Sequence, residues 1–395
     1  MSEKKKEIMG VGKNVLLLGV TSLLTDVSSE MIHPLLPLFI ASIGGTATAI
    51  GIIGSLGEFV SSILKIISGH LSDKKGRQLP FVFSGYFLSS ATKIFFAFST
   101  QWYHVLILKT IERIGKGLRT APRDVIIANS KRALRGRAFG IHRAMDTLGA
   151  VFGSILALIL FFFLGFGFRE IFLIGGFLGF LALIPLLHVK DVKRKPIATS
   201  LLVTISELPA KFKIFLIIVA LFALGNFTEW LFILKAQSAL YLDMDYRTSI
   251  AYALGFYILF NIFYAGFSTP AGTISDRIGR KKILLLGYFL FSIAAIGFVF
   301  FDSIFLMILL FVIYGLAKAF IEGTQRAFAS DLVPESIRGT ALGTFHLIIA
   351  LATLPSGFIA GFLWDSFGAE TAFEYASIMS FFAILLLAFF REDRF

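Results

Sequence analysis

Long apolar runs make up most of the chain, and short charged segments separate them. A run of roughly 18 or more apolar residues can cross the hydrocarbon layer of a bilayer as an α-helix. Open strands would leave backbone groups unpaired in lipid, and these runs are too long for barrel strands, so they predict helices. We therefore expect an all-α membrane protein with twelve transmembrane helices, at residues 14–43, 48–70, 79–99, 103–127, 137–164, 168–189, 213–241, 248–274, 282–301, 303–327, 339–364 and 370–390.

The second half of the chain repeats landmarks of the first half at a constant offset. Ser68–Gln78 returns as Ala271–Lys281, Arg135–Gly140 as Arg338–Gly343, and Thr25-Asp26 as Thr228-Glu229, each 203 residues later. Three separated landmarks with one offset indicate a duplication and not a chance motif. The repeat predicts two six-helix bundles, at 1–189 and 213–395, related by a pseudo-two-fold repeat and joined by a charged cytoplasmic linker at 190–212.

Composition and charge placement agree with this organisation. Hydrophobic residues make up 56% of the chain and charged residues 16%, against about 45–50% and about 25% in soluble domains. The absence of cysteine excludes disulfides and thiolate metal sites. Of the Lys and Arg residues, 24 lie in one alternating set of loops and two in the other. This asymmetry places both termini in the cytoplasm and explains the net charge of +12 without a nucleic-acid partner.

The repeated stretch has the form G-x-L-x-D-K-x-G-R after the second span, and a close copy follows the eighth span. The positions concerned are Gly69, Asp73, Gly76 and Arg77 in the first copy and Gly272, Asp276, Gly279 and Arg280 in the second. With twelve spans in two similar halves, this signature resembles the major facilitator superfamily over essentially the whole chain. The resemblance implies a secondary transporter in the cell membrane that works by alternating access. We expect a monomer that uses no cofactor, with a proton gradient as the driving force.

The signature also has a local physical logic. Asp73 lies near the C-terminus of its predicted helix, where the helix dipole disfavours an anion. Arg77 follows Gly76, which can take a left-handed turn, so Arg77 can fold back towards Asp73. The resemblance implies that this acid also meets the other half and latches the cytoplasmic gate. The alternative is ordinary loop chemistry.

The fourth span carries a charged stripe on one helical face. Its members are Lys109, Glu112, Lys116, Arg119 and Arg123, spaced three and four residues apart. Because such a stripe cannot face lipid, we expect it to face a substrate cavity. The segment from Arg113 to Gly117 resembles the R-x-x-Q-G motif of proton-driven members, with Lys116 in place of Gln. The tenth span carries Lys318, Glu322 and Arg326 at corresponding spacing, so the two stripes are expected to neutralise each other in part.

The first span places Asp26, Glu30 and His33 on one face. Carboxyl groups buried at low dielectric bind protons more readily than in water, which suits proton coupling, with Glu112, Asp146 and Glu229 as further candidates. The alternative is that these acids form salt bridges with the stripe of the fourth span. Asp26 followed by Pro34 and Pro37 resembles the drug and amine antiporter branch, although the fifth span lacks that branch's Gly-Pro.

Other polar groups in the spans complete the expected cavity and its surroundings. Arg143, Glu58 and Asn261 are further cavity candidates, and Gly149 and Gly153 are expected to allow close helix packing. Lys93 and Asp124 are expected to reach the membrane interface.

These features predict a transporter and not an enzyme, since no Walker A pattern and no nucleophile–base pair beside an aqueous domain occurs. The preferred hypothesis is proton-coupled efflux of a small organic solute. An alternative is proton-coupled transport of an anionic metabolite or a siderophore-like metal chelate. A third is a divalent-cation carrier that uses Asp26, Glu30 and His33.

Overall fold

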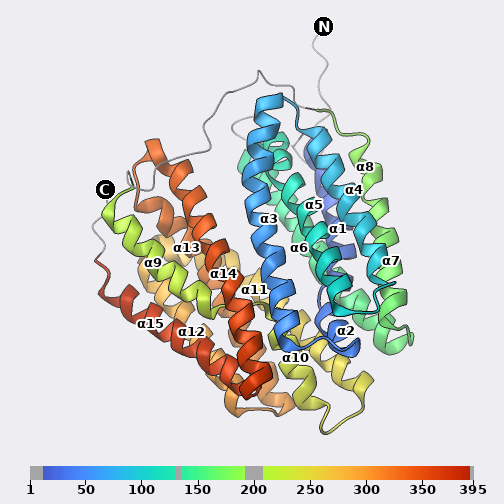
Figure 1. The fold of residues 1–395 in the computed structure, drawn as a ribbon. Coiled ribbons are helices and arrows are strands. Elements are labelled where there is room, and N and C mark those ends of the chain that lie inside the picture. The colour runs from blue at the N-terminus through green and yellow to red at the C-terminus, as the bar shows by residue number, and fades with distance from the viewer. Residues whose placement is uncertain (1–11, 130–134, 192–207, 392–395) are drawn as a thin grey trace. The chain divides into compact units, whose positions relative to one another are not determined.

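The computed structural model describes residues 12–129, 135–191 and 208–391, and all regular elements in these ranges are helices (Figure 1). The first half contains α1 (Lys13–Ile32), α2 (Leu36–Ser42), α3 (Ala47–Lys75), α4 (Leu79–Phe96), α5 (Trp102–Ala128), α6 (Arg135–Leu158) with a π-helical turn at Ile159–Phe163, α7 (Phe168–Leu181) and α8 (Leu183–Leu186). The second half contains α9 (Ala210–Gly225), α10 (Glu229–Leu240), α11 (Tyr246–Ile278), α12 (Arg280–Phe300), α13 (Ile304–Asp331), a 3-10 turn at Glu335–Ile337, α14 (Arg338–Phe367) and α15 (Ala369–Phe389). The all-α prediction is confirmed.

Eleven helical segments of the described residues are long and apolar enough to cross a membrane. The one predicted span missing from these eleven is the fourth, which corresponds to α5. This helix has 27 residues and is about 40 Å long at 1.5 Å per residue. Its length suffices, but its charged stripe makes it too polar to be recognised by hydropathy alone. Most of the predicted linker lies outside the described residues.

Three of the predicted spans each divide into two helices, and the sixth does so at Ala182, between α7 and α8. The first divides into α1 and α2 around Pro34, which has no backbone N–H to continue the helix. The seventh divides into α9 and α10 at Asn226–Thr228, where Asn226 leaves the helical conformation (φ −91°, ψ 68°) and the hydroxyl of Thr228 accepts from the backbone N–H of Trp230. Glu229 therefore begins a helix, whereas its repeat mate Asp26 lies inside α1. The two positions match in sequence and differ in structure.

The same helix pairs pack together in each half. In the first half α1 packs on α6 and α7, and α4 packs on α5 and α7. In the second half the corresponding pairs recur, since α9 packs on α14 and α15, and α12 packs on α13 and α15. The duplication read from the sequence is thus also a duplication of packing.

Contacts between residues divide the chain into two compact units, and the first half of the sequence contributes to both of them. Met1–Leu35 groups with Val60–Leu201, and Leu36–Phe59 groups with Leu202–Phe395. One reason is that Asp365 of α14 accepts hydrogen bonds from the backbone N–H groups of Ala47 and Thr48, at 2.9 and 2.8 Å. It therefore caps the N-terminus of α3, whose dipole favours an anion. The predicted domain boundaries stay a prediction.

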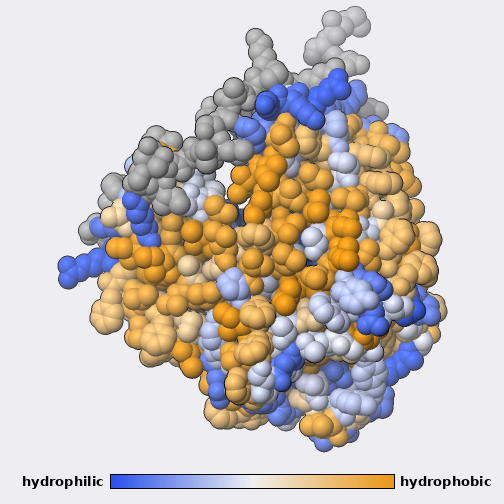
Figure 2. All heavy atoms as spheres, in the orientation of Figure 1, coloured by the Kyte–Doolittle hydropathy of each residue, from blue (hydrophilic) through white to orange (hydrophobic). Residues whose placement is uncertain are grey.

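Large apolar side chains cover much of the outer surface. Phe163, Phe177, Phe305 and Phe389 are each more than half exposed, and Figure 2 shows hydrophobic residues over broad areas of the visible face, with hydrophilic residues gathered mainly towards its upper and lower edges. Water would penalise such a surface, and lipid does not. The exposed apolar residues therefore fit a protein whose helices are embedded in a bilayer.

Small residues allow the close approach of α1 and α6. A Cβ atom added at Gly149 would lie 2.5 Å from the carbonyl oxygen of Leu23 and 3.1 Å from Cβ of Asp26. One added at Gly153 would lie 3.0 Å from Cβ of Glu30. These glycines hold the acidic face of α1 against α6, as the small-residue spacing predicts.

We expect Gly149→Ala to destabilise the protein by about 1–3 kcal/mol, because the added methyl group meets backbone that cannot easily move. Gly140→Ala on the same helix has nothing within 4 Å of the new Cβ and serves as the control, which should be neutral or slightly stabilising. Thermal unfolding of the purified variants in detergent measures the difference. Equal melting temperatures for the two variants would contradict the close packing of α1 on α6.

Candidate functional site

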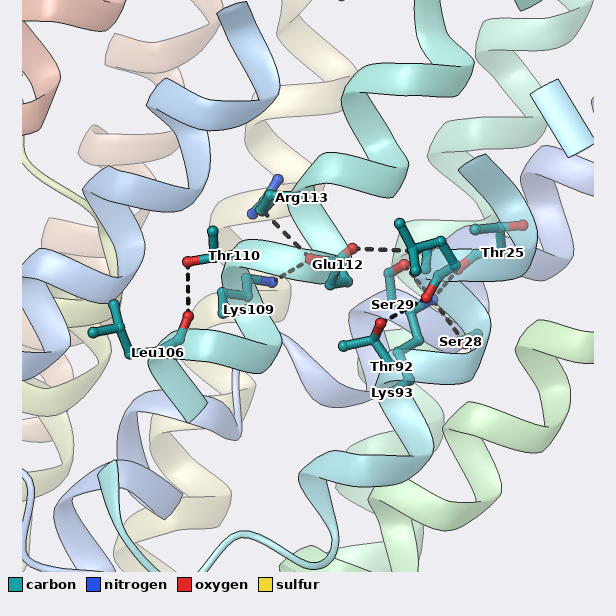
Figure 3. A network of polar contacts seen from close by, with 12 residues as sticks. Thr25, Ser28, Ser29, Thr92, Lys93, Leu106, Lys109, Thr110, Glu112 and Arg113 are labelled. Carbon is teal, nitrogen blue, oxygen red and sulfur yellow. Dashed lines mark hydrogen bonds and ion pairs between the residues drawn. The ribbon is translucent and has the colours of Figure 1, made fainter. Parts of the chain in front are cut away.

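The first part of the charged stripe of α5 belongs to an internal ion network (Figure 3). Glu112 lies at its centre and forms ion pairs with Lys109 at 3.0 Å and with Arg113 at 3.5 Å. The hydroxyl of Ser89 on α4 donates to the same carboxylate at 3.3 Å. Lys109, Glu112 and Arg113 are each 5% exposed. This part of the stripe supports the alternative that some intramembrane charges hold helices together.

The amino group of Lys93 lies inside the first unit, so the prediction that it reaches the membrane interface is wrong. Lys93 is 2% exposed, and its Nζ donates to the hydroxyls of Ser28 and Ser29 at 3.0 and 2.8 Å and to the carbonyl oxygen of Thr25 at 3.4 Å (Figure 3). An ammonium group has three donors, and three oxygens of α1 accept them. The polar face of α1 supplies in the interior what water would supply at the interface.

Asp26 has a different carboxyl neighbour from the one its sequence spacing suggests. Its carboxyl group lies near that of Asp146 on α6, and Asp146 accepts from the hydroxyl of Ser22. Arg143 approaches Asp146 at 3.8 Å. The two acids belong to helices that pack against each other, α1 and α6. Two carboxyl groups can share a hydrogen bond only when one of them holds a proton.

The remaining bases of the stripe follow α5 towards its C-terminal end. The guanidinium of Arg119 stacks over the ring of Tyr86 at 4.2 Å and is 5% exposed, and its Nη1 has no hydrogen-bond partner. Arg123 bonds the neighbouring Asp124 at 3.0 and 3.1 Å. Lys116 is half-buried. Asp124 remains partly exposed, so the interfacial prediction for this residue is not contradicted.

The second unit has a polar face on α13. Nζ of Lys318 donates to the side-chain oxygen of Asn226 at 3.0 Å and lies 5.6 Å from the ring centre of Tyr314. Glu322 accepts from the hydroxyl of Tyr264 on α11. Glu322 and Arg326 are exposed, although both lie on a membrane-spanning helix.

The other predicted cavity residues have varied surroundings. The amide of Asn261 donates to the carbonyl of Tyr257 on its own helix at 3.1 Å. Glu58 and Arg143 are exposed, and Glu30, His33 and Glu229 are half-buried and make further interactions. The structure thus brings Asp26 together with Asp146, and not with a metal-ligand set.

The repeated signature ends its two helices in the same way. Gly76 and Gly279 both have positive φ, 64° and 106°, and each ends its helix, α3 or α11. Asp73 and Asp276, which correspond between the two repeats, lie three residues before these glycines. In the second copy Arg280 folds back on Asp276 at 2.9 Å and also pairs with Asp331. In the first copy Arg77 is exposed. The helices extend a turn beyond the predicted spans, so each acid is helical and not part of a loop.

Among residues 12–129, 135–191 and 208–391, no group of three or more His, Cys, Asp or Glu side chains lies close enough together to hold a metal ion. Asp26, Glu30 and His33 share a face of α1 without converging on one point. The hypothesis of a divalent-cation carrier therefore has no support from the geometry, and we do not pursue it.

Several polar residues that matter in the structure were not singled out as site residues from the sequence. Lys93 stands alone in an apolar run, Asn226 interrupts another, and Ser22 and Tyr264 resemble ordinary helix residues. Asn226 and Lys93 could have been found as isolated polar residues in long apolar segments, where each must have a partner. Tyr264 gives no such signal.

Comparison with known proteins identifies the class of protein to which the chain belongs. A profile of the Major Facilitator Superfamily matches residues 18–263 and 246–395. The chain belongs to the major facilitator superfamily and is a multi-pass integral membrane transporter. It is 45% identical over 383 residues to an uncharacterised MFS-type transporter of Methanocaldococcus jannaschii, covering 96% of this chain and 95% of that protein.

Two further similarities bear on fold and function. Over 128 residues the chain is 32% identical to the multi-drug resistance efflux pump PmrA of Streptococcus pneumoniae, covering 32% of each protein. The solved structure of the nucleoside transporter NupG superposes with a TM-score of 0.76 at 16% identity, covering 95% of this chain and 98% of that one. The D-xylose-proton symporter gives 0.73 at 17% identity, covering 96% and 98%. At such identities the two structures confirm the fold alone.

We expect Glu112→Gln to cost about 3–5 kcal/mol of stability, because it leaves Lys109 and Arg113 buried without their shared counter-ion. Asp124→Asn on the same helix removes a partly exposed partner and should cost about 0–1 kcal/mol. Chemical unfolding of both variants in detergent measures the comparison. If Glu112→Gln is as stable as the parent, the ion network does not hold α5 in place.

Proposed function

We propose that this transporter exports a small organic solute in exchange for protons, and that the Asp26–Asp146 pair carries the coupling proton. The observation that supports this most directly is the proximity of the two half-buried carboxyl groups on the packed helices α1 and α6. A proton bound there neutralises one acid, and its release leaves two negative charges close together. The charge between α1 and α6 thus differs between the protonated and deprotonated forms, so the two forms favour different packing of these helices.

Coupling follows from that difference. A ligand shifts a conformational equilibrium only by its differential affinity for the two states. Lys116 and Arg119 carry positive charge in the same unit as Asp26, and a conformation that brought them closer to the acid pair would favour proton release. In this scheme proton binding and release alternate with the two states of the transport cycle.

The direction of transport is supported by resemblance and not by geometry. The similarity to PmrA and the Asp26 pattern of the first span both favour efflux. Cytoplasmic termini are part of the proposal, since the charge asymmetry between the loops favours that orientation. A monomeric state is also part of it.

Uptake or export of an anionic metabolite or metal chelate is the second candidate function. It is favoured by the bases of α5, of which Arg119 has an unpartnered, buried guanidinium nitrogen. An anion would satisfy that donor. The transport assay below separates the candidates through the charge of the solute and the sign of its response to the pH gradient.

We also propose that Asp73 and Asp276 act as cytoplasmic gate latches. Each acid lies in the last turns of its helix, where the dipole disfavours it, and Arg280 compensates Asp276 in the second copy. An acid near a helix C-terminus is unfavourable unless another group compensates its charge. Such an acid is suited to a contact that forms in only one conformation.

Asp26→Asn should retain solute binding and solute counterflow but lose accumulation driven by a pH gradient, because an amide at this position imitates a permanently protonated acid. The measurement uses proteoliposomes, a panel of labelled cationic, anionic and zwitterionic solutes, and pH gradients of both signs. Asp146→Asn should give the same separation of counterflow from accumulation.

Asp243→Asn, at an exposed position between α10 and α11, is the matched control and should transport like the parent. Full gradient-driven accumulation by both Asp26→Asn and Asp146→Asn would show that the proton is carried elsewhere. Accumulation of anions alone, in the direction of proton flow, would favour the second candidate function.

Asp276→Asn should change the balance of conformations and leave solute affinity nearly unchanged, because it removes one of the two acids that pair with Arg280. The chain has no native cysteine, so spin labels can be attached through cysteines introduced at the exposed positions Lys74 and Arg277. Double electron–electron resonance then reports the distance distribution. An unchanged distribution in Asp276→Asn and in Asp73→Asn would rule out the latch.

A further inference from the structure

Three charged residues lie on one face of α13, four residues apart. Lys318, Glu322 and Arg326 alternate in sign, and this spacing places neighbours within reach of an ion pair. Yet no ion pair joins any two of them in the described part of the chain. Lys318 bonds the amide oxygen of Asn226, and Glu322 bonds the hydroxyl of Tyr264.

This arrangement keeps a cation and an anion apart. Asn226 is uncharged and comes from the break between α9 and α10, and Tyr264 is uncharged and comes from α11. Each neutral partner orients its charged neighbour without neutralising it. An exposed carboxylate on a membrane-spanning helix is costly against lipid, so Glu322 must face a wet or ligand-filled space.

The surroundings of Lys318 supply the other parts of a binding site. The ring of Tyr314 lies below its amino group, and the hydroxyl of Tyr314 is buried without a hydrogen-bond partner. The span is interrupted beside Asn226, as transporter helices often are where they meet a substrate. An apolar wall, an unused hydroxyl and two separated charges of opposite sign therefore occur together within the second unit.

We infer that α13 recognises a zwitterionic solute, with the carboxylate of the solute at Lys318 and its ammonium group at Glu322. Four residues of helix rise separate the Cα atoms of Lys318 and Glu322 by about 6 Å along the axis. The charges of the solute should therefore be several bonds apart, as in an ω-amino acid. The inference rests on the proposed transport function, because it names the class of the cargo. Pairing both charges with the solute replaces the water that each loses, whereas a singly charged solute leaves one of them uncompensated.

Four probes with the same five-carbon chain test the inference on the purified full-length protein by isothermal titration calorimetry. They are 5-aminopentanoate with separated charges, norvaline with adjacent charges, pentylamine with only the cation, and pentanoate with only the anion. We expect 5-aminopentanoate to bind most tightly, by about tenfold over either singly charged probe, for one additional charge-assisted contact.

Lys318→Gln and Glu322→Gln should each weaken binding of 5-aminopentanoate by about tenfold. Lys282→Gln and Glu374→Gln make the same chemical changes at exposed positions of α12 and α15 and should bind like the parent. The exchange Lys318→Glu with Glu322→Lys keeps one charge of each sign and should recover part of the lost affinity. Thermal unfolding checks that each variant is folded.

The inference is overturned if 5-aminopentanoate shows no saturable binding, if pentylamine or pentanoate binds as tightly, if norvaline binds more tightly, or if folded Lys318→Gln and Glu322→Gln keep the parental affinity. These outcomes differ from failure of the proposed function. Loss of this recognition leaves proton-driven transport of other solutes through Asp26 intact, whereas failure of the Asp26 test leaves these binding constants unchanged.

Discussion

The cost of placing charge in a bilayer is the constraint on which the rest of this structure depends. Each ionisable side chain in a span must lose its hydration, and the protein must replace it. It does so with partners of different kinds: two cations surround Glu112, and three oxygens of α1 surround the amino group of Lys93. These two arrangements balance or solvate a fixed charge, whereas the proposed role of the Asp26–Asp146 pair depends on a proton that can leave.

The helices were predictable because apolar length and the repeat are written directly in the sequence. The interruptions within the helical spans were only partly predictable. Pro34 signals an interruption of the first span, but Asn226 ends α9 without a proline, and an asparagine in an apolar run does not by itself fix where the backbone turns. The extension of α3 and α11 past the predicted spans depends on the left-handed glycines that end them, and not on hydropathy.

The candidate site was predicted in its residues and less well in its pairings. Spacing of four along α1 suggested Glu30 as the neighbour of Asp26, but α6 crosses α1 so closely at Gly149 that Asp146 occupies that place. Lys93 shows the same limit. A single helix determines which side chains share a face, while the partner helix determines which of them meet, and the latter depends on packing between segments distant in sequence.

The recurrence of the same four helix pairs in both halves also has an evolutionary consequence. Packing of α1 with α6 and α7, and of α4 with α5 and α7, has its counterpart in α9, α12 and their neighbours, so the architecture is specified twice by small and apolar residues. Exposed charged residues of α13, such as Glu322 and Arg326, add to this architecture without defining its helix pairs, whereas the buried Glu112 of α5 helps to hold its helix in place. A lineage can therefore change the exposed charges of α13 one at a time and acquire a new cargo while inheriting an intact scaffold.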